Sequence, residues 1–325
     1  MTSDEEMKLV PGQENFQENM AVDRLVSFGS VASGSNSSLE VQESSYTTYT
    51  KTNLFRELMC CTCAFLFGLY SPTSFFRPIL GVNMRPIPYQ ILKSGDVVLQ
   101  LGLNNPLVEN VTVPSRLLLN TSITLPLIVM VIITQLAPHP QCVKSFDTHS
   151  CACVLLLTIG LSEFTTQMVK MYVGRLRPNF YDLCKFDSEN LECTASDSHI
   201  MESRSSFPSG HSSLSAAGMG VLVWFLLGRA NLGQNMNGKK KNRNPKLSAM
   251  VALLPLAWSL FVASSRLVDN WHHPSDIVAG LCLGLFFPSL VYHLFYPSVI
   301  SSQAGVPLNY LASVAHSGSG EKDSL

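Results

Sequence analysis

The chain has 325 residues, of which 46% are hydrophobic and only 14% are charged. This composition provides enough apolar material for several membrane spans and leaves too few charges for a typical soluble protein. The formal net charge of -1 gives no indication of a nucleic-acid partner, and we expect none.

The two ends of the chain are polar. Residues 1–53 are rich in Ser, Glu, Thr and Asn, so we expect a disordered tail there. No short apolar segment with a small-residue cleavage site opens the chain, so we expect no removable signal peptide. A second polar tail is expected over residues 297–325, which leaves residues 54–296 as the membrane domain.

Five apolar stretches, and a sixth interrupted by polar residues, lie between the tails. Each is about long enough to cross roughly 30 Å of hydrocarbon. Six such stretches in series predict an all-α, polytopic membrane protein rather than the buried core helices of a soluble fold. The predicted spans are Phe55–Phe75, Leu117–Leu136, Cys151–Val169, Ser212–Leu227, Leu247–Ser264 and Ile277–Tyr296.

The connection 229–246 indicates the orientation of the spans. It contains GKKKNRNPK, the densest cluster of basic residues in a short connection. Short basic connections favour the cytosol, although a solvated basic loop needs no further explanation. With this loop inside, both tails are cytosolic, and the connections after the first, third and fifth spans are extracellular or lumenal. The protein is then integral to the plasma membrane or an endomembrane.

Two outer connections carry candidate modification sites. Asn110-Val-Thr112, after the first span, is a candidate glycosylation site. Cys184 and Cys193 lie in the predicted outer connection 171–208. Because an oxidising compartment permits disulfides, we favour a bridge between these cysteines over two free thiols.

Two basic residues lie at the outer end of the third span. Arg177 follows Lys170 by seven positions, which is about two helical turns, so both cations fall on one face if the helix continues. Arg175 is expected on another face. A guanidinium and an ammonium together suit a phosphate, but basic residues also anchor span ends. Glu163 is expected either to partner Lys170 or to make an interhelical hydrogen bond.

The fourth span begins with Pro-Ser-Gly-His at residues 208–211. Glycine lets the backbone approach a ligand closely, and the first-turn N–H groups of a helix bind anions. We therefore expect a phosphate cradle at Ser209 and Gly210, with His211 placed to give a proton to a departing alkoxide. A helix start with an incidental histidine is the alternative.

The stretch from 265 to 276 reads SRLVDNWHHPSD and joins a polar segment to the last span. Pro274 suits the first turn of a helix, so this span is expected to begin there. Asp276 then lies four residues after His272 and is expected to accept a hydrogen bond from one ring nitrogen. The other ring nitrogen is left free to attack. A helix start that caps itself with polar side chains is the alternative.

The three motifs are predicted to lie at one membrane face. The orientation comes from a basic loop that contains none of them, so it supports their grouping independently. Asp269 is expected either to bind Arg266 or to be a plain loop aspartate. Gly280 and Gly284, in the last span, are expected to permit close helix packing rather than ligand contact.

The pattern K-x6-RP, then PSGH, then SR-x5-H-x3-D resembles the signature of the type 2 phosphatidic acid phosphatase superfamily, also called lipid phosphate phosphatases. The similarity in arrangement covers residues 55–296. The residues that match the signature are Lys170, Arg177, Pro178, Pro208, Ser209, Gly210, His211, Ser265, Arg266, His272 and Asp276.

The resemblance implies a six-helix membrane core and hydrolysis of a phosphomonoester through a phosphohistidine, without a metal ion or another cofactor. It implies that His272 attacks phosphorus with support from Asp276. His211 would protonate the leaving group and then activate water. The phosphate-binding residues that the resemblance implies are Lys170, Arg177, Arg266 and the backbone at Ser209 and Gly210.

We therefore expect an integral membrane lipid phosphate phosphatase with its active site at the extracellular or lumenal ends of the helices. Its expected partners are membrane lipids and a substrate such as phosphatidate, lysophosphatidate or a sphingolipid phosphate. A second enzyme hypothesis keeps the site but acts on a polyisoprenyl diphosphate or a small phosphate ester. A third is a non-enzymatic membrane scaffold or signalling protein, which the complete catalytic set disfavours.

Overall fold

The computed structural model describes residues 36–230, 232 and 244–319. Its chain separates into residues 1–51 and a larger unit, residues 52–325, which contains the membrane helices and is described below. Six helices in the described residues are long and apolar enough to cross a membrane, which confirms the predicted all-α polytopic class. They are Lys51–Leu80, Ser115–Leu136, Lys144–Val173, Gly210–Arg229, Lys246–Val268 and Pro274–Phe295.

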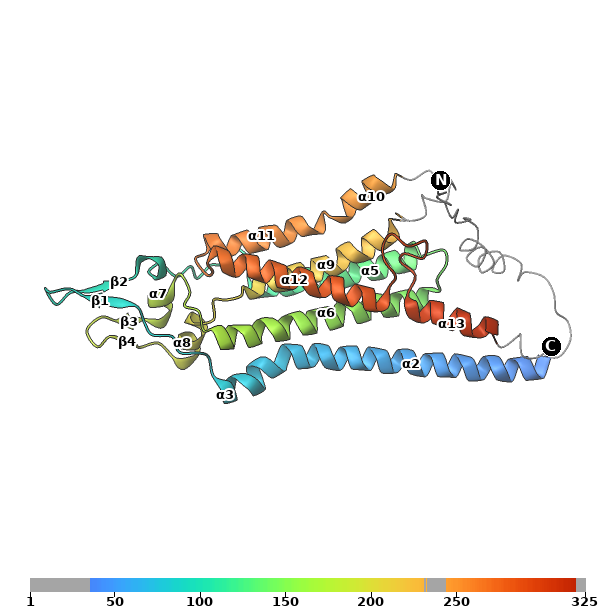
Figure 1. The fold of residues 1–325 in the computed structure, drawn as a ribbon, viewed down its shortest axis with the longest axis horizontal. Helices are drawn as coiled ribbons and strands as arrows, with labels where there is room; N and C mark the ends of the chain where they lie inside the picture. The colour runs from blue at the N-terminus through green and yellow to red at the C-terminus, as the bar shows by residue number, and fades with distance from the viewer. Residues whose placement is uncertain (1–35, 231, 233–243, 320–325) are drawn as a thin grey trace, which may run out of the picture. The chain divides into compact units, whose positions relative to one another are not determined.

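The spans are built from one or more helical segments each (Figure 1). Short π-helical or 3-10 segments link some of them, and two small hairpins lie in the connections. The helices are α2 (Asn36–Ser71), α3 (Arg77–Leu80), α4 (Ser115–Leu119), α5 (Leu125–Leu136), α6 (Lys144–Val173), α7 (Phe180–Cys184), α8 (Asp197–Ser203), α9 (Gly210–Arg229), α10 (Pro245–Ala252), α11 (Pro255–Val268), α12 (Pro274–Phe295) and α13 (Leu308–Ser319). The linking segments and strands are η1 (Pro72–Phe76), η2 (Leu101–Leu103), η3 (Asn120–Thr124), β1 (Tyr89–Ile91), β2 (Val97–Leu99), β3 (Phe186–Asp187) and β4 (Glu192–Cys193).

Local sequence explains where three of the spans begin or end. Gly174 ends α6 in a left-handed conformation with φ of 58°, which glycine adopts without steric cost. The Ser209 side chain caps α9 by accepting a hydrogen bond from the Ser212 N–H. Pro274 occupies the first turn of α12, as predicted. These three boundaries are the places where the sequence motifs lie.

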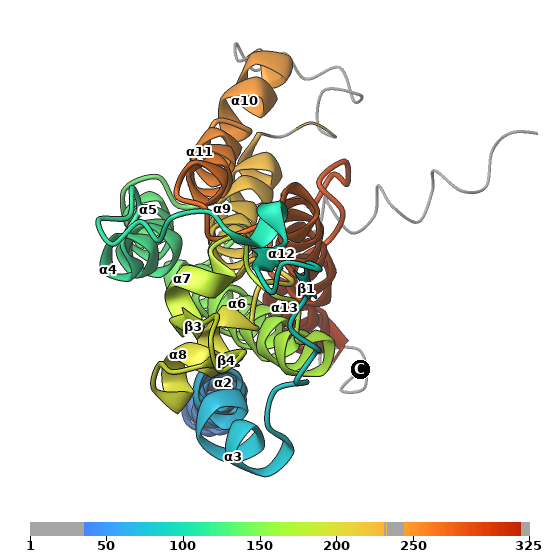
Figure 2. The same ribbon diagram turned by 90° about the vertical axis from the view of Figure 1, so that its left-hand side faces the viewer.

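Helix α9 lies at the centre of the bundle, with α6, α11 and α12 packed around it (Figure 2). Glycines let α12 approach it closely. A Cβ atom on Gly280 would lie 2.5 Å from the Ser209 carbonyl oxygen, and one on Gly284 would lie 2.3 Å from that of Ser213. Because real Cβ contacts are not this short, both positions require glycine. The predicted packing role of the two glycines is confirmed.

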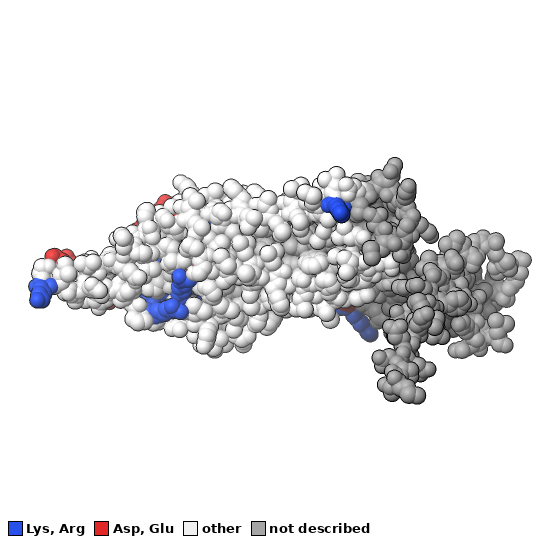
Figure 3. All heavy atoms as spheres, turned by 45° about the horizontal axis from the view of Figure 1, so that its top comes forward, with Lys and Arg blue, Asp and Glu red and all other residues white. Residues whose placement is uncertain are grey.

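The surface of the described residues matches a membrane setting. Large apolar side chains such as Phe67, Ile128, Phe261 and Leu294 are exposed on the span helices. On the face drawn in Figure 3, basic and acidic side chains gather toward the ends of the helices, and the stretch between them is almost free of charge. An exposed apolar belt of this kind suits contact with lipid tails.

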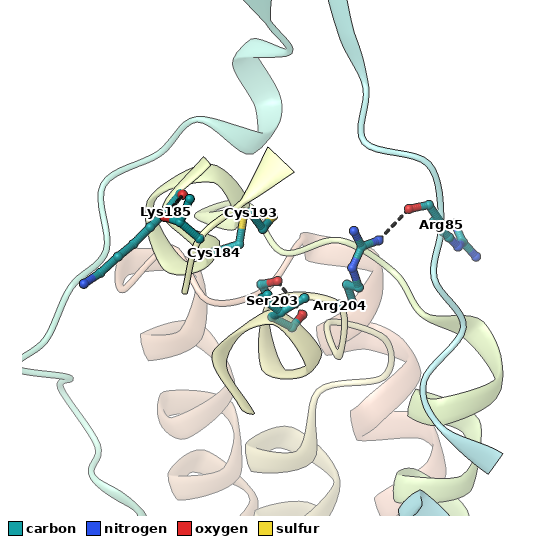
Figure 4. The surroundings of a disulfide bond; sticks show 8 residues. Arg85, Cys184, Lys185, Cys193, Ser203 and Arg204 are labelled. Carbon is teal, nitrogen blue, oxygen red and sulfur yellow. Dashed lines mark hydrogen bonds between the residues drawn. A yellow bond between two sulfur atoms is a disulfide. The ribbon is translucent and has the colours of Figure 1, made fainter. Parts of the chain in front are cut away.

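The two long connections at the motif end of the bundle are structured. The first contains the antiparallel pair β1–β2, and the second contains α7, the pair β3–β4 and α8. Cys184, at the end of α7, is disulfide-bonded to Cys193 of β4, so the two cysteines predicted to pair are bonded (Figure 4). Nearby, the Arg204 side chain donates to the Arg85 carbonyl and joins the two connections.

Helical structure is also described on either side of the predicted membrane domain, residues 54–296. Helix α2 begins at Asn36, so residues 36–53 are helical, and residues 1–35 lie outside the described part. After the last span, Ala304 and Val306 are buried, and the Tyr310 ring packs on Phe146. The sequence did not predict this packing after the last span, because the segment is largely polar and only a few of its side chains enter the core.

Candidate active site

The three motifs meet at one end of the bundle, where α6 ends, α9 begins and α11 is joined to α12 (Figures 1 and 2). A cavity of about 650 Å³ lies between them. Ser209 and Asp276, which are fully buried, lie outside its lining. The predicted site residues that line the cavity are Lys170, Arg177, Gly210, His211, Arg266 and His272.

His272 is oriented by the backbone. Its Nδ1 lies 2.7 Å from the Ser206 carbonyl oxygen, which can only accept, so Nδ1 carries the proton. The lone pair is therefore on Nε2. Asp276 Oδ2 is 3.8 Å from Nδ1, so the hydrogen bond that we predicted between these side chains is not formed. Burial lowers the pKa of His272 to about 3, which keeps the imidazole neutral and nucleophilic at pH 7.

Asp276 is instead the centre of a buried hydrogen-bond network. It accepts from Arg175 Nη1 at 2.6 Å, from Ser206 Oγ at 2.6 Å and from the His273 N–H at 2.9 Å. Since the carbonyl of Ser206 holds His272, this carboxylate supports the imidazole through the Ser206 segment and the start of α12. Sequence reasoning missed Arg175 as a site residue.

Arg175 was missed because α6 ends before it. The prediction placed Lys170 and Arg177 on one helical face, but the helix stops at Val173 and Gly174 turns the chain. Helical spacing therefore does not apply beyond residue 173. The condition for placing both cations on one helical face, a helix that continues to Arg177, is not met. Both cations nevertheless line the cavity.

Arg177 is held by a residue that the sequence did not single out. Its Nε donates to the Glu202 carbonyl at 2.8 Å, and its Nη2 pairs with the Glu202 carboxylate. The guanidinium also lies 4.7 Å from the centre of the Trp271 ring. Burial by itself would raise the pKa of Glu202, but Arg177 together with Lys170, Arg77 and His272 outweighs burial and lowers that pKa. Glu202 lies in α8, a short helix whose sequence carries no motif.

Arg266 has a carboxylate partner as well. Its Nη2 donates to Asp269 Oδ2 at 2.7 Å, which confirms the first of the two roles predicted for Asp269. Asp269 also accepts from the backbone and hydroxyl of Thr112, at 2.9 and 2.7 Å. The first outer connection, including the exposed Asn110, is thereby tied to the cavity wall.

The start of α9 forms another wall. Lys170 Nζ lies 3.3 Å from the position that a Cβ atom on Gly210 would occupy, so a side chain there would crowd the ammonium. His211 Nε2 is buried and has no hydrogen-bond partner among the described residues. The Ser209 N–H donates to the Asp276 carbonyl at 2.9 Å, so it is not available to an anion, contrary to the prediction.

Glu163 lines the same cavity and interacts electrostatically with Lys170, in line with the first of its two predicted roles, but no interhelical hydrogen bond of its side chain is found in the described part of the chain. It accepts from Gln167 Nε2 at 2.6 Å, one turn along its own helix. The described residues contain no cluster of three or more His, Cys, Asp or Glu side chains arranged to hold a metal ion.

Comparison with known proteins identifies the family to which the chain is similar. The PAP2 superfamily pattern matches residues 152–300. The chain is 30% identical over 188 residues to an Arabidopsis thaliana protein named probable lipid phosphate phosphatase 4, covering 55% of this chain and 59% of that protein. It is 32% identical over 204 residues to a PA-phosphatase related-family protein of Dictyostelium discoideum, covering 63% and 68% of the two chains.

A third relative is diacylglycerol pyrophosphate phosphatase 1 of Saccharomyces cerevisiae, with 28% identity over 210 residues, covering 61% of this chain and 70% of that protein. The chain spans about three-fifths of the length of the first lipid phosphate phosphatases that it matches, 59% and 62%. No solved structure matches it.

Proposed function

The chain belongs to the PAP2 superfamily, and from that premise we propose that it is an integral membrane lipid phosphate phosphatase. The observation that carries the proposal is the environment of His272. Its Nδ1 is fixed on a carbonyl oxygen, its Nε2 lone pair is free, and it lines a cavity together with His211 and the three predicted cations Lys170, Arg177 and Arg266. A neutral imidazole facing a cationic pocket suits attack on a phosphate.

In this mechanism His272 Nε2 bonds to the phosphorus of a phosphomonoester. The bond between phosphorus and the lipid oxygen breaks, and that oxygen takes a proton from His211. Water then attacks the phosphohistidine, gives its proton back to His211 and releases inorganic phosphate with free His272. Protons and charge balance over the two steps, and the family resemblance assigns the same roles.

The three cations stabilise the charge on the equatorial oxygens during both steps. Lys170, Arg177 and Arg266 lie around the cavity before substrate binds, so little reorganisation is needed. Arg177 and Arg266 are already held by Glu202 and Asp269. These carboxylates restrict the guanidinium positions, and Glu202 also competes with the phosphate for Arg177.

A lipid substrate is supported by the apolar part of the cavity lining. Leu118 and Leu119, on the second span, line the cavity together with Leu107 and Leu214. Acyl chains in the bilayer can lie against the second span while the phosphate reaches His272. We propose phosphatidate, lysophosphatidate or a sphingolipid phosphate as the substrate class, hydrolysed at the outer or lumenal leaflet.

The test is phosphate release from phosphatidate in micelles of a phosphate-free detergent, with EDTA present. We expect the full-length protein to release phosphate and His272→Ala to lower the rate by at least about 1000-fold, because the nucleophile is lost. Thermal unfolding should show that the variant is folded. Release that persists in the variant would contradict the phosphohistidine route. A folded wild-type protein that is silent on all lipid phosphates would favour the scaffold hypothesis.

A further inference from the structure

Arg77 is a cavity residue that belongs to none of the three motifs. It begins α3, at the end of the first span, and its side chain lines the same cavity as His272. Its Nε and Nη2 atoms are buried and have no hydrogen-bond partner among the described residues. Buried N–H groups without acceptors are unfavourable, because their lost hydration is not replaced. This points to an acceptor that arrives with a ligand.

The neighbours of Arg77 suggest where that ligand lies. Arg77 is close enough to Lys170 and Glu202 to interact with both electrostatically. Lys170 also interacts electrostatically with Arg177, so it has an arginine neighbour from each of two segments, Arg77 and Arg177. In the described part of the chain, neither Lys170 nor Arg77 has a carboxylate within ion-pair distance, whereas Arg177 does.

Two neighbouring cations whose carboxylate neighbours lie beyond ion-pair distance are stabilised by an anion that lies between them. In the proposed mechanism, the phosphate attacked by His272 is bound by Arg177, Arg266 and Lys170 and lies near His211. A second anionic group of the same ligand would lie between Lys170 and Arg77. A lipid with one phosphate has no such group at that place, whereas a lipid diphosphate does.

We propose that Arg77 forms a second anion-binding site, which holds the inner phosphate of a lipid diphosphate while the terminal phosphate lies at His272. This inference rests on the proposed phosphatase function and extends its substrate class from lipid monophosphates to lipid diphosphates. The bond from His272 Nε2 to the terminal phosphorus forms, and the bond to the bridging oxygen breaks. The leaving lipid monophosphate takes a proton from His211, and water later hydrolyses the phosphohistidine. Arg77 and Lys170 stabilise the charge on the leaving phosphate.

The alternative is an arginine that binds phosphates of the surrounding bilayer at the end of a span. To distinguish a phosphate of the substrate from a phosphate of the bilayer as the ligand of Arg77, kcat/KM is measured in micelles of a phosphate-free detergent. The substrate is then the only source of phosphate groups. The two substrates are a diacylglycerol diphosphate and the phosphatidate with the same acyl chains. The selectivity is the ratio of their kcat/KM values.

We expect Arg77→Gln to lower this selectivity by about tenfold, because a charge-assisted hydrogen bond is lost for one substrate only. Arg77→Lys should restore part of it, since a lysine keeps the charge but not the fork of donors. Arg116→Gln removes an exposed arginine near the start of the second span and should not change the ratio. An equal loss for both substrates, or an unchanged ratio in Arg77→Gln, would overturn the proposal.

A wild-type protein that hydrolyses neither substrate would contradict the proposed function but not yet the second site. In that case the binding of inorganic pyrophosphate and of orthophosphate is measured by calorimetry. A loss of affinity in Arg77→Gln that is about tenfold larger for pyrophosphate would support the site without turnover. Equal affinities in the two proteins would overturn it.

Discussion

At the scale of single residues, the sequence predicted which side chains gather but not what each one contacts. His272 binds a main-chain carbonyl, and every residue carries one, so no residue type could indicate Ser206 in advance. Arg175 was set aside by a helical argument that the left-handed Gly174 invalidates. Both omissions concern the Asp276 network, where contacts across the chain decide the partner. The signature residues themselves were predictable because their chemistry requires their type.

This network gives a prediction for Arg175. Arg175 touches Asp276 but does not line the cavity, so it is a positioning residue and not a catalytic one. We expect Arg175→Gln to lower kcat by about 10-fold to 100-fold with little change in KM, because a buried carboxylate loses its charged partner and the His272 segment shifts. Steady-state kinetics on phosphatidate give both constants, and Arg175→Lys should recover part of kcat.

The matched control for Arg175 is its second partner. Arg175 also donates to Ser275 Oγ at 2.7 Å, and in the described part of the chain the Ser275 side chain makes no hydrogen bond to Asp276. Ser275→Ala should therefore stay within about twofold of wild type. A kcat for Arg175→Gln that matches Ser275→Ala would contradict the positioning role, and so would an effect on KM alone.

At the scale of helices, hydropathy and capping residues predicted the spans closely. The fourth was expected at Ser212–Leu227 and runs over Gly210–Arg229. The sequence did not predict α8, which delivers Glu202, because a helix of seven residues is stabilised by its surroundings more than by its own pattern. The same holds for the segment after the last span, whose buried residues are few and separated.

The contact between α9 and α12 leads to a prediction on stability. A Cβ atom at Gly284 would meet the backbone oxygen of Ser213, which cannot move without disturbing α9. We expect Gly284→Ala to lower the free energy of unfolding by about 1–3 kcal/mol through overpacking. The melting temperature in detergent reports this loss. Gly102→Ala is the control, because nothing lies within 4 Å of a Cβ there, and equal melting temperatures for both variants would contradict the close contact.

At the scale of the whole molecule, the alternation of spans explains how distant motifs meet. Odd-numbered spans end, and even-numbered spans begin, on one side of a membrane, so the motifs after spans three and five and before spans four and six must share a face. The sequence therefore predicted their grouping by counting. It did not predict Arg77, because the approach of the first span to the cavity depends on helix packing that no motif records.

The side of the membrane on which the cavity lies is the last prediction. Asn190 is exposed on the turn between β3 and β4, at the cavity end, and Glu192→Thr creates an N-x-T glycosylation triplet there. Asn237→Thr creates one at Asn235 in the basic connection, which lies outside the described residues. Three native triplets begin at Asn36, Asn110 and Asn120, and each is removed by an Asn→Gln change. In that background, full-length protein made in eukaryotic cells should be glycosylated only in the Glu192→Thr variant, because the transferase acts in the lumen. Loss of the mobility shift after glycosidase treatment identifies the modified chain. A glycan that depends on Asn237→Thr would contradict the predicted topology. It would indicate that the candidate active site faces the cytosol.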